Sequence, residues 1–191
     1  FSRMFPDTLV NKGLGQNKGV ELTVEKFFNK GYFFLLTGSL YDSKAMGNDK
    51  VWRNTDFNGR YAVNAVAGTE KKVGKSAFNI SGKLTIGGGK RFSPIDTLAS
   101  RIKGEMVVID AQRNTKKMAN YFRFDMKLGW KYNSHKYGLT HEIAIDLINV
   151  TGHKNELSYT YQPDNVKLGI DPVVKQYQLG FLPLLYYKID F

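Results

Sequence analysis

One segment of the chain carries a large apolar side chain at every second position without a break. Its apolar positions are Phe122, Phe124, Met126, Leu128, Trp130 and Tyr132. Its polar positions are Arg123, Asp125, Lys127 and Lys131. Because successive side chains of a β-strand point to opposite faces, the segment is predicted to form a strand with one apolar and one polar face. The apolar face is too broad for an edge strand in water, and the pattern favours a strand that crosses a membrane.

The last residues of the chain repeat this alternation. The apolar parity holds Leu185, Tyr187, Ile189 and Phe191. Strands of membrane barrels turn apolar side chains to lipid and place aromatic side chains at the membrane interface. The ending resembles the C-terminal assembly signal of bacterial outer-membrane β-barrels, which implies contact with the barrel-assembly machinery.

Weaker alternation predicts further strands at residues 20–25, 32–41, 57–68, 78–86 and 139–147. Across these patterns, lipid contact is predicted for Phe122, Phe124, Met126, Leu128, Trp130, Ile143, Ile145 and Leu147. A polar barrel lumen is predicted to be lined by Arg60, Asn64, Arg123, Asp125, Lys127, Glu142 and Asp146. A solvated barrel interior is the preferred interpretation of these polar residues over a ligand site.

The predicted connections alternate in length. Short turns are expected near residues 29–31, 70–76 and 133–137. Long connections are expected near residues 42–56, 87–119 and 150–176. Outer-membrane barrels combine short periplasmic turns with long extracellular loops, so the alternation supports such a barrel.

The count of strands indicates a piece of a larger barrel. About seven spanning strands are expected, whereas single-chain bacterial barrels have even numbers and close with about eight or more. The chain also begins at Phe1 with no signal peptide, as expected for a processed protein or a fragment. The predicted fold is all-β, an antiparallel transmembrane β-barrel of which the chain is a C-terminal fragment of about seven to eight strands. Residues 1–18 are expected to be the remainder of a loop, and residues 19–191 the barrel strands and loops, with no plug domain.

Composition removes several classes of function. The absence of Cys excludes disulfide scaffolds and thiolate chemistry. No apolar run approaches the roughly 18–20 residues of a membrane-spanning helix. The net charge of +11 is spread along the chain, which argues against nucleic acid as a partner and leaves outer-membrane lipid or lipopolysaccharide.

No residue pattern indicates catalysis, a metal or another cofactor. His135, His141 and His153 lack metal-ligand spacing. Ser39 and Ser81 lie at positions that would face a lumen, but no nucleophile-elbow motif surrounds either. The chain is therefore expected not to be an enzyme, although a lipid-modifying enzyme stays among the alternatives.

Three segments resemble strands of TonB-dependent outer-membrane receptors, in order and spacing. They are residues 121–128 (YFRFDMKL), 141–155 (HEIAIDLINVTGHKN) and 181–191 (FLPLLYYKIDF). The residue pattern of these segments is most similar to that of the Bacteroidetes-type members. The resemblance implies the outer membrane of a Gram-negative bacterium and a plugged barrel of about twenty-two strands. It also implies uptake of a scarce ligand, such as an iron chelate, cobalamin or a glycan, driven by the TonB complex through a plug that lies outside this chain.

Three other functions remain open at this point. They are a non-transporting outer-membrane barrel with a structural or adhesive role, a lipid-modifying enzyme and a soluble all-β ligand binder.

Overall fold

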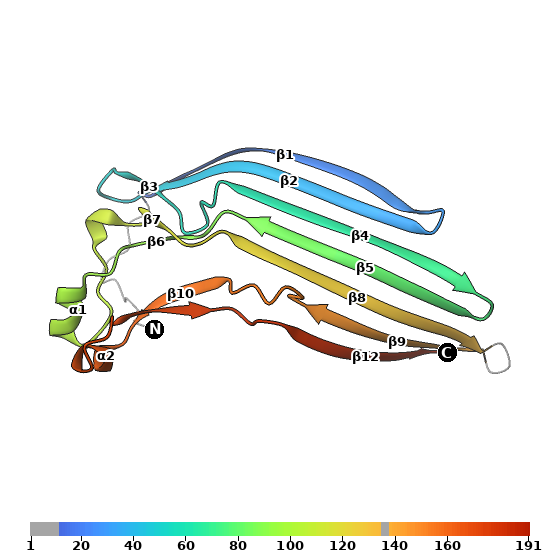
Figure 1. Cartoon of the computed structure of the whole chain (residues 1–191). Helices are drawn as coiled ribbons and strands as arrows, with labels where there is room; N and C mark the ends of the chain where they lie inside the picture. Colours follow the sequence, from blue (N-terminus) through green and yellow to red (C-terminus); the bar gives the residue numbers. More distant parts are fainter. Residues whose placement is uncertain (1–11, 135–137) are drawn as a thin grey trace.

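The computed structural model describes residues 12–134 and 138–191. A single antiparallel meander runs the length of the molecule, in the strand order β1-β2-β4-β5-β8-β9-β12 (Figure 1). Its long strands are β1 (Leu14–Asn29), β2 (Tyr32–Met46), β4 (Tyr61–Val73), β5 (Ser76–Gly87), β8 (Tyr121–Ser134), β9 (Leu139–Ile148) and β12 (Leu182–Asp190). A short strand, β3 (Trp52–Asn54), pairs with the end of β2. The all-β antiparallel prediction is confirmed.

The remaining elements gather at one end of the sheet (Figure 1). Two small sheets are formed by β6 (Arg91–Phe92) with β7 (Lys116–Lys117) and by β10 (Glu156–Tyr161) with β11 (Val173–Tyr177). The helical pieces are α1 (Thr97–Lys103), a 3-10 turn (Asp110–Gln112) and α2 (Pro163–Lys167). We call this the long-connection end, and the opposite end of the strands the short-turn end.

Short and long connections alternate as the sequence predicts. The turn between β1 and β2 has positive φ at Lys30 and Gly31, as tight hairpins require, and Gly74 has positive φ in the turn between β4 and β5. The turn between β8 and β9 includes residues 135–137, which lie outside the described residues, as does the turn histidine at 135. The connections β2–β4, β5–β8 and β9–β12 are long and all lie at the other end.

Two strands extend further than alternation predicted. β1 begins at Leu14, inside the segment expected to be loop remainder, and β2 continues to Met46, inside the loop expected at 42–56. The register continues through Lys18 beside Asp42, and Ser43 donates a hydrogen bond to Asn17 Oδ1 at 2.6 Å. The two strands stay paired here although neither face is apolar. Alternation of apolar and polar residues therefore could not predict these strand ends. The part of the expected loop at residues 1–11 lies outside the described residues.

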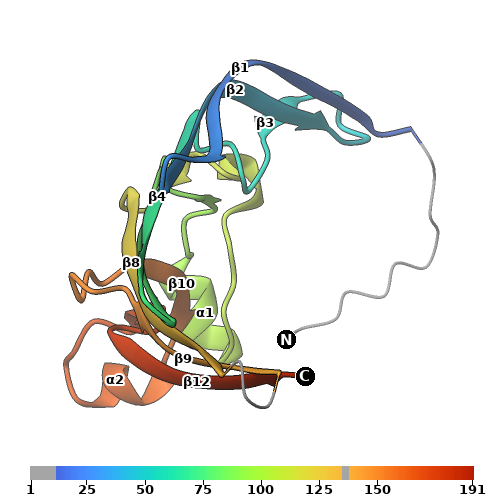
Figure 2. The ribbon, with the colours of Figure 1, turned by 90° about the vertical axis from the view of Figure 1, so that its right-hand side faces the viewer.

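The sheet is strongly curved and open (Figure 2). Within the described residues β1 pairs only with β2 along the meander and β12 pairs only with β9, so the described strands do not close into a barrel. The face turned toward the viewer in Figure 1 is the convex one, since it lies on the outer side of the curve after the rotation to Figure 2. Among the residues that the structure describes, both edges of the sheet therefore keep unpaired backbone groups.

Candidate membrane-facing surface and the polar face behind it

The pairing register places every residue that was predicted to face lipid on one face of the sheet. Phe124 pairs with Leu84 of β5, and Trp130 pairs with Ile143 of β9, and directly paired residues share a face. The shared face carries Phe122, Phe124, Met126, Leu128, Trp130, Ile143, Ile145 and Leu147. It continues over β5 through Phe78, Ile80, Leu84 and Ile86, and over β1 and β2 through Val20, Leu22, Val24, Phe34, Leu36 and Leu40. We call this surface the apolar band.

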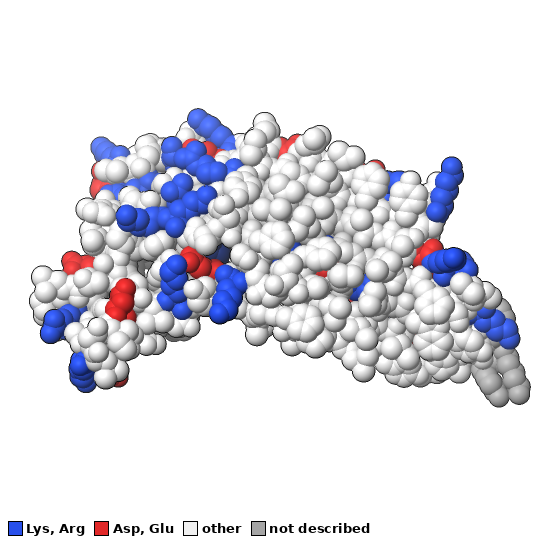
Figure 3. Space-filling view, in the orientation of Figure 1, with Lys and Arg blue, Asp and Glu red and all other residues white. Residues whose placement is uncertain are grey.

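The apolar band carries no charged side chain, and Figure 3 shows this face white across the middle of the sheet. On β1 the first charges on this face are Lys18 and Lys26, with Val20, Leu22 and Val24 between them. At about 3.3 Å per residue the two lysines stand about 26 Å apart along the strand. This agrees with the roughly 25 Å height of the apolar band on outer-membrane barrels.

Aromatic side chains border the band at the short-turn end. The rings of Trp130 and Tyr132 lie 6.1 Å apart, and Lys26 Nζ lies 3.6 Å from the centre of the Tyr32 ring. His141, on the apolar parity as expected, stacks on Tyr187 with its Nδ1 3.0 Å from the Tyr187 hydroxyl. Amphipathic aromatic rings of this kind suit a boundary between apolar and aqueous surroundings.

The C-terminal strand joins the same face. Leu185 pairs with Ile145, Tyr187 with Ile143, and Ile189 with His141. Phe191 follows the end of β12 at Asp190 and its side chain is 98% exposed. Leu185, Tyr187 and Ile189 therefore extend the apolar band to the β12 edge, and the role of these residues and Phe191 in assembly stays a prediction.

The opposite, concave face is polar and crowded. Asn64, Arg123, Asp125, Lys127, Glu142 and Asp146, all predicted to line a lumen, lie on this face. Small residues fill the spaces between them: Ala144 is 1% exposed, and Asn79 lies so close over Gly129 that a side chain there would collide with it.

Ion pairs join side chains of the concave face, both within β8 and between strands. Arg123 Nε donates to both carboxylate oxygens of Asp125, at 2.7 and 2.9 Å. Lys127 Nζ lies 3.5 Å from Asp146, and Lys131 lies between Glu70 and Glu142 at 4.0 and 3.9 Å. These side chains are partly exposed, so the pairs stabilise the fold weakly and leave a hydrated surface.

Arg60 is the exception among the predicted lumen residues. It precedes β4 with a positive φ of 78°, and its Nη2 lies 3.4 Å from Asp42 Oδ1 at the long-connection end. The prediction that Arg60 points into the lumen from within a strand is wrong, because β4 begins only at Tyr61. Alternation alone does not locate a strand's first residue.

Two buried asparagines fasten the β9–β12 connection to the sheet. The side-chain amide of Asn155 accepts from Phe122 N at 2.9 Å and donates to Phe122 O at 2.8 Å, so it takes the place of a neighbouring strand. Asn149 has a positive φ of 51°, and its backbone N–H donates to Asp125 at 2.8 Å. Both lie in the segment 141–155 that carries part of the sequence resemblance, although their anchoring role was not predicted.

Glu156 ties three segments together at the same place. Its carboxylate accepts from Lys175 Nζ at 2.7 Å, Ala119 N at 2.9 Å and Tyr159 Oη at 3.2 Å. The hydrogen bond from Lys175 lowers the pKa of Glu156 below its ordinary value, although burial of the carboxyl opposes this. The charged form is therefore the one that holds the segments together.

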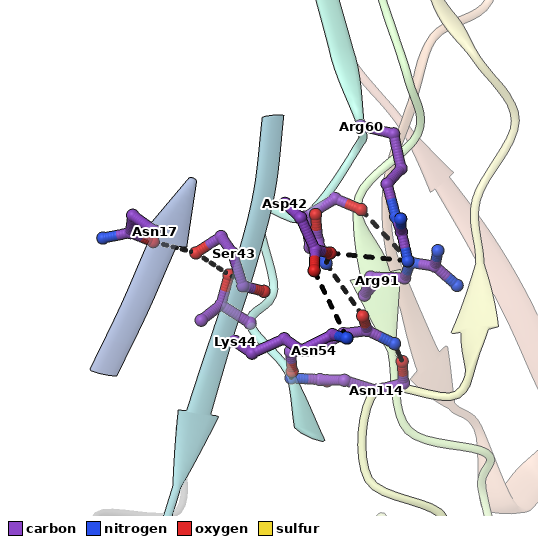
Figure 4. A network of polar contacts seen from close by, with 10 residues as sticks. Asn17, Asp42, Ser43, Lys44, Asn54, Arg60, Arg91 and Asn114 are labelled. Carbon is purple, nitrogen blue, oxygen red and sulfur yellow. Dashed lines mark hydrogen bonds and ion pairs between the residues drawn. The ribbon is translucent and has the colours of Figure 1, made fainter. Parts of the chain in front are cut away.

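A second polar network fastens the β2–β4 connection (Figure 4). Asn58 is fully buried and its Nδ2 donates to Asp42 and Asn54, both at 2.8 Å. Asn114 Nδ2 donates to Asn54 O at 2.8 Å and Asp56 Oδ1 at 2.7 Å, across a long separation in sequence. Sequence reasoning missed both asparagines, because single polar residues in long loops carry no periodic signal.

A cleft of about 840 Å³ opens beside this network, between β3 and the 3-10 turn. Its charged lining residues are Asp49, Arg53, Asp56, Asp110 and Arg113. In residues 12–134 and 138–191 no three His, Cys, Asp or Glu side chains come together in a way that would hold a metal ion. Ser39 Oγ donates a hydrogen bond to Glu21 at 3.0 Å, between the paired strands β1 and β2.

No helix of the described chain is both long and apolar enough to span a membrane. Comparison with protein-family models, curated proteins and solved structures finds no match to this chain. The resemblance to TonB-dependent receptors therefore rests on the three sequence segments alone.

Proposed function

We propose that this chain is the C-terminal part of the outer-membrane barrel of a TonB-dependent receptor that takes up a scarce ligand. One observation carries the proposal: a charge-free apolar band covers the convex face of a long-stranded antiparallel meander. Monomeric soluble proteins rarely expose a contiguous apolar patch larger than a few hundred Å². A bilayer would cover this band on all of its strands at once.

The remaining geometry agrees with a barrel segment. Short turns lie at one end and long connections at the other, as on outer-membrane barrels. The curved sheet carries its polar side chains on the concave face, where a barrel has its lumen. The open edges at β1 and β12 are the places where further strands would continue the sheet.

The receptor role adds a transport function to this architecture. It is supported by the order and spacing of the segments at 121–128, 141–155 and 181–191. The charged cleft at the long-connection end gives a place where a ligand meets the protein before uptake. A non-transporting outer-membrane barrel is the second candidate. It would explain the apolar band equally well, but it would not explain the order and spacing of the three segments.

The experiment is membrane fractionation followed by crosslinking in the cell that encodes the protein. The encoded protein is expected in the outer-membrane fraction, and an in-cell crosslinker is expected to join it to TonB. A strain without TonB is the control for the crosslinked band. Recovery in the outer membrane without a TonB-dependent band would favour the non-transporting barrel, and recovery as a water-soluble monomer would contradict both.

A further inference from the structure

Cationic side chains gather on the convex face where the apolar band ends at the long-connection end (Figure 3). We call four of them the basic patch: Lys18, Lys44, Arg60 and Lys117. Lys18 follows the parity of Val20 on β1, and Lys44 follows that of Leu40 on β2, so both lie on the convex face just beyond the band.

A single carboxylate, Asp42, ties two of these cations together. Asp42 is the register partner of Lys18. Its carboxylate lies 3.2 Å from Lys44 Nζ and 3.4 Å from Arg60 Nη2, and it also accepts from Asn58 at 2.8 Å. Because one carboxylate serves two cations and a buried amide, the patch keeps an excess of positive charge.

Lys117 completes the patch from another segment. Its Nζ lies 5.9 Å from the centre of the Tyr61 ring, which stands on the convex face beside Leu40. Val63 follows Tyr61 on the same face, so the ammonium of Lys117 stands at the border of the apolar band. The basic patch thus spans segments that are distant in sequence and share one border.

We infer that the basic patch binds the phosphate groups of an anionic lipid in the outer leaflet, with the lipid's acyl chains lying on the apolar band. The inference rests on the proposed function, which sets the band in the bilayer. The guanidinium of Arg60 offers a fork of donors that suits phosphate oxygens, and the lysines supply point charges. A nucleic acid would also complement the positive charge, but it would leave the adjoining apolar side chains without an apolar partner.

The opposite border of the band differs. Lys26 Nζ donates to Asn29 O at 2.9 Å and Tyr32 O at 3.2 Å and sits over the Tyr32 ring, so its charge is already engaged within its own hairpin. Lys71, the register partner of Phe78, is a further cation at this border, whereas the long-connection end gathers the four cations of the basic patch. In the proposed orientation the long-connection end is the extracellular end.

The test measures lipid retained by the encoded protein, purified from the membrane in neutral detergent and offered bilayer discs of phosphatidylcholine with or without diphosphorylated lipid A. The variant Lys18→Gln/Lys117→Gln removes two exposed cations that make no ion pair with Asp42. Lys71→Gln/Lys75→Gln removes the same charge from exposed positions near the short-turn end and is the matched control. Adding Arg60→Gln to the first variant extends the series.

The first variant is expected to lower retention of lipid A at least about tenfold, since each cation near an anionic surface adds to the attraction. The control variant is expected to retain lipid A like the unmodified protein. Equal retention by both variants would overturn the inference, as would loss of oligonucleotide binding without loss of lipid. These outcomes are read on protein recovered from the outer membrane, and failure to recover it there would count against the proposed function instead.

Discussion

The strand region and the long-connection end bury opposite kinds of side chain. Among the described residues, the buried apolar ones are Ala77 and Ala144, both small and both in long strands. The buried polar residues lie outside the long strands and are Asn58, Ser100, Asn114, Asn149 and Asn155. Large apolar residues of the strands, such as Leu36, Leu128 and Ile145, are exposed instead.

This difference separates two ways of holding a fold together. At the long-connection end, amide side chains satisfy backbone groups and keep irregular segments in place, as in a protein surrounded by water. In the strand region the strands between the two open edges are hydrogen-bonded on both sides, but in the part of the chain that the structure describes their apolar side chains have no second layer to pack against. The fold of the strands is therefore suited to surroundings that are themselves apolar.

The largest expected effect comes from placing a charge in the apolar band. Leu36→Lys is expected to destabilise the protein in a bilayer by about 2–4 kcal/mol, the cost of a lysine near the middle of a membrane. Thr37→Lys, one residue away on the concave face, is the matched control and is expected to cost much less. The measurement is the free energy of unfolding by denaturant in lipid vesicles, and equal costs at the two positions would break the comparison.

A smaller effect is expected from removing an amide anchor. Asn155→Ala leaves the N–H and C=O of Phe122 without their partners and is expected to cost about 1–3 kcal/mol. Asn133→Ala removes only an exposed hydrogen bond from Thr140 and serves as the control. The same unfolding measurement applies. An unchanged free energy of unfolding in Asn155→Ala would mean that buried amide side chains do not hold the long-connection end in place.

The smallest effect concerns the pH dependence of the long-connection end. Because the pKa of Glu156 is lowered in the folded protein, its contribution is present above its ordinary value of 4.5 and is lost as pH falls through the folded pKa. Glu156→Gln is therefore expected to cost about 1.5 kcal/mol near neutral pH and progressively less in acid. Unfolding of both proteins is compared across this range. A difference that stays constant with pH would show that the carboxylate charge plays no part.

Sequence alternation predicted the sheet better than its surroundings. The strict series at 122–132 and the series at 143–147 fall on one face because both strands follow period two through their full apolar length. The same rule predicted the concave position of Asn64, Asp125 and Glu142. It placed Arg60 wrongly, since the strand was predicted from residue 57 and β4 begins only at Tyr61.

Sequence alternation could not predict how the long-connection end is held together. Asn58, Asn114 and Asn155 act through single contacts to backbone or side chains far away in sequence, which no local pattern records. The small strands β6 and β7 are also too short to give a period. The sheet is open because β1 and β12 do not pair with each other among the described residues. Which strands pair depends on the whole sheet and cannot be inferred from a single segment.

The most direct test of lipid contact uses neighbouring positions on β8, since the chain has no Cys and each introduced thiol is unique in it. Spin labels are attached at Leu128→Cys and, separately, at Lys127→Cys in the protein reconstituted in vesicles. The label at 128 is predicted to be relaxed by oxygen, which concentrates in the bilayer, and the label at 127 by a water-soluble nickel chelate. Equal access of the nickel chelate to both labels would contradict the central claim that the convex face lies against lipid.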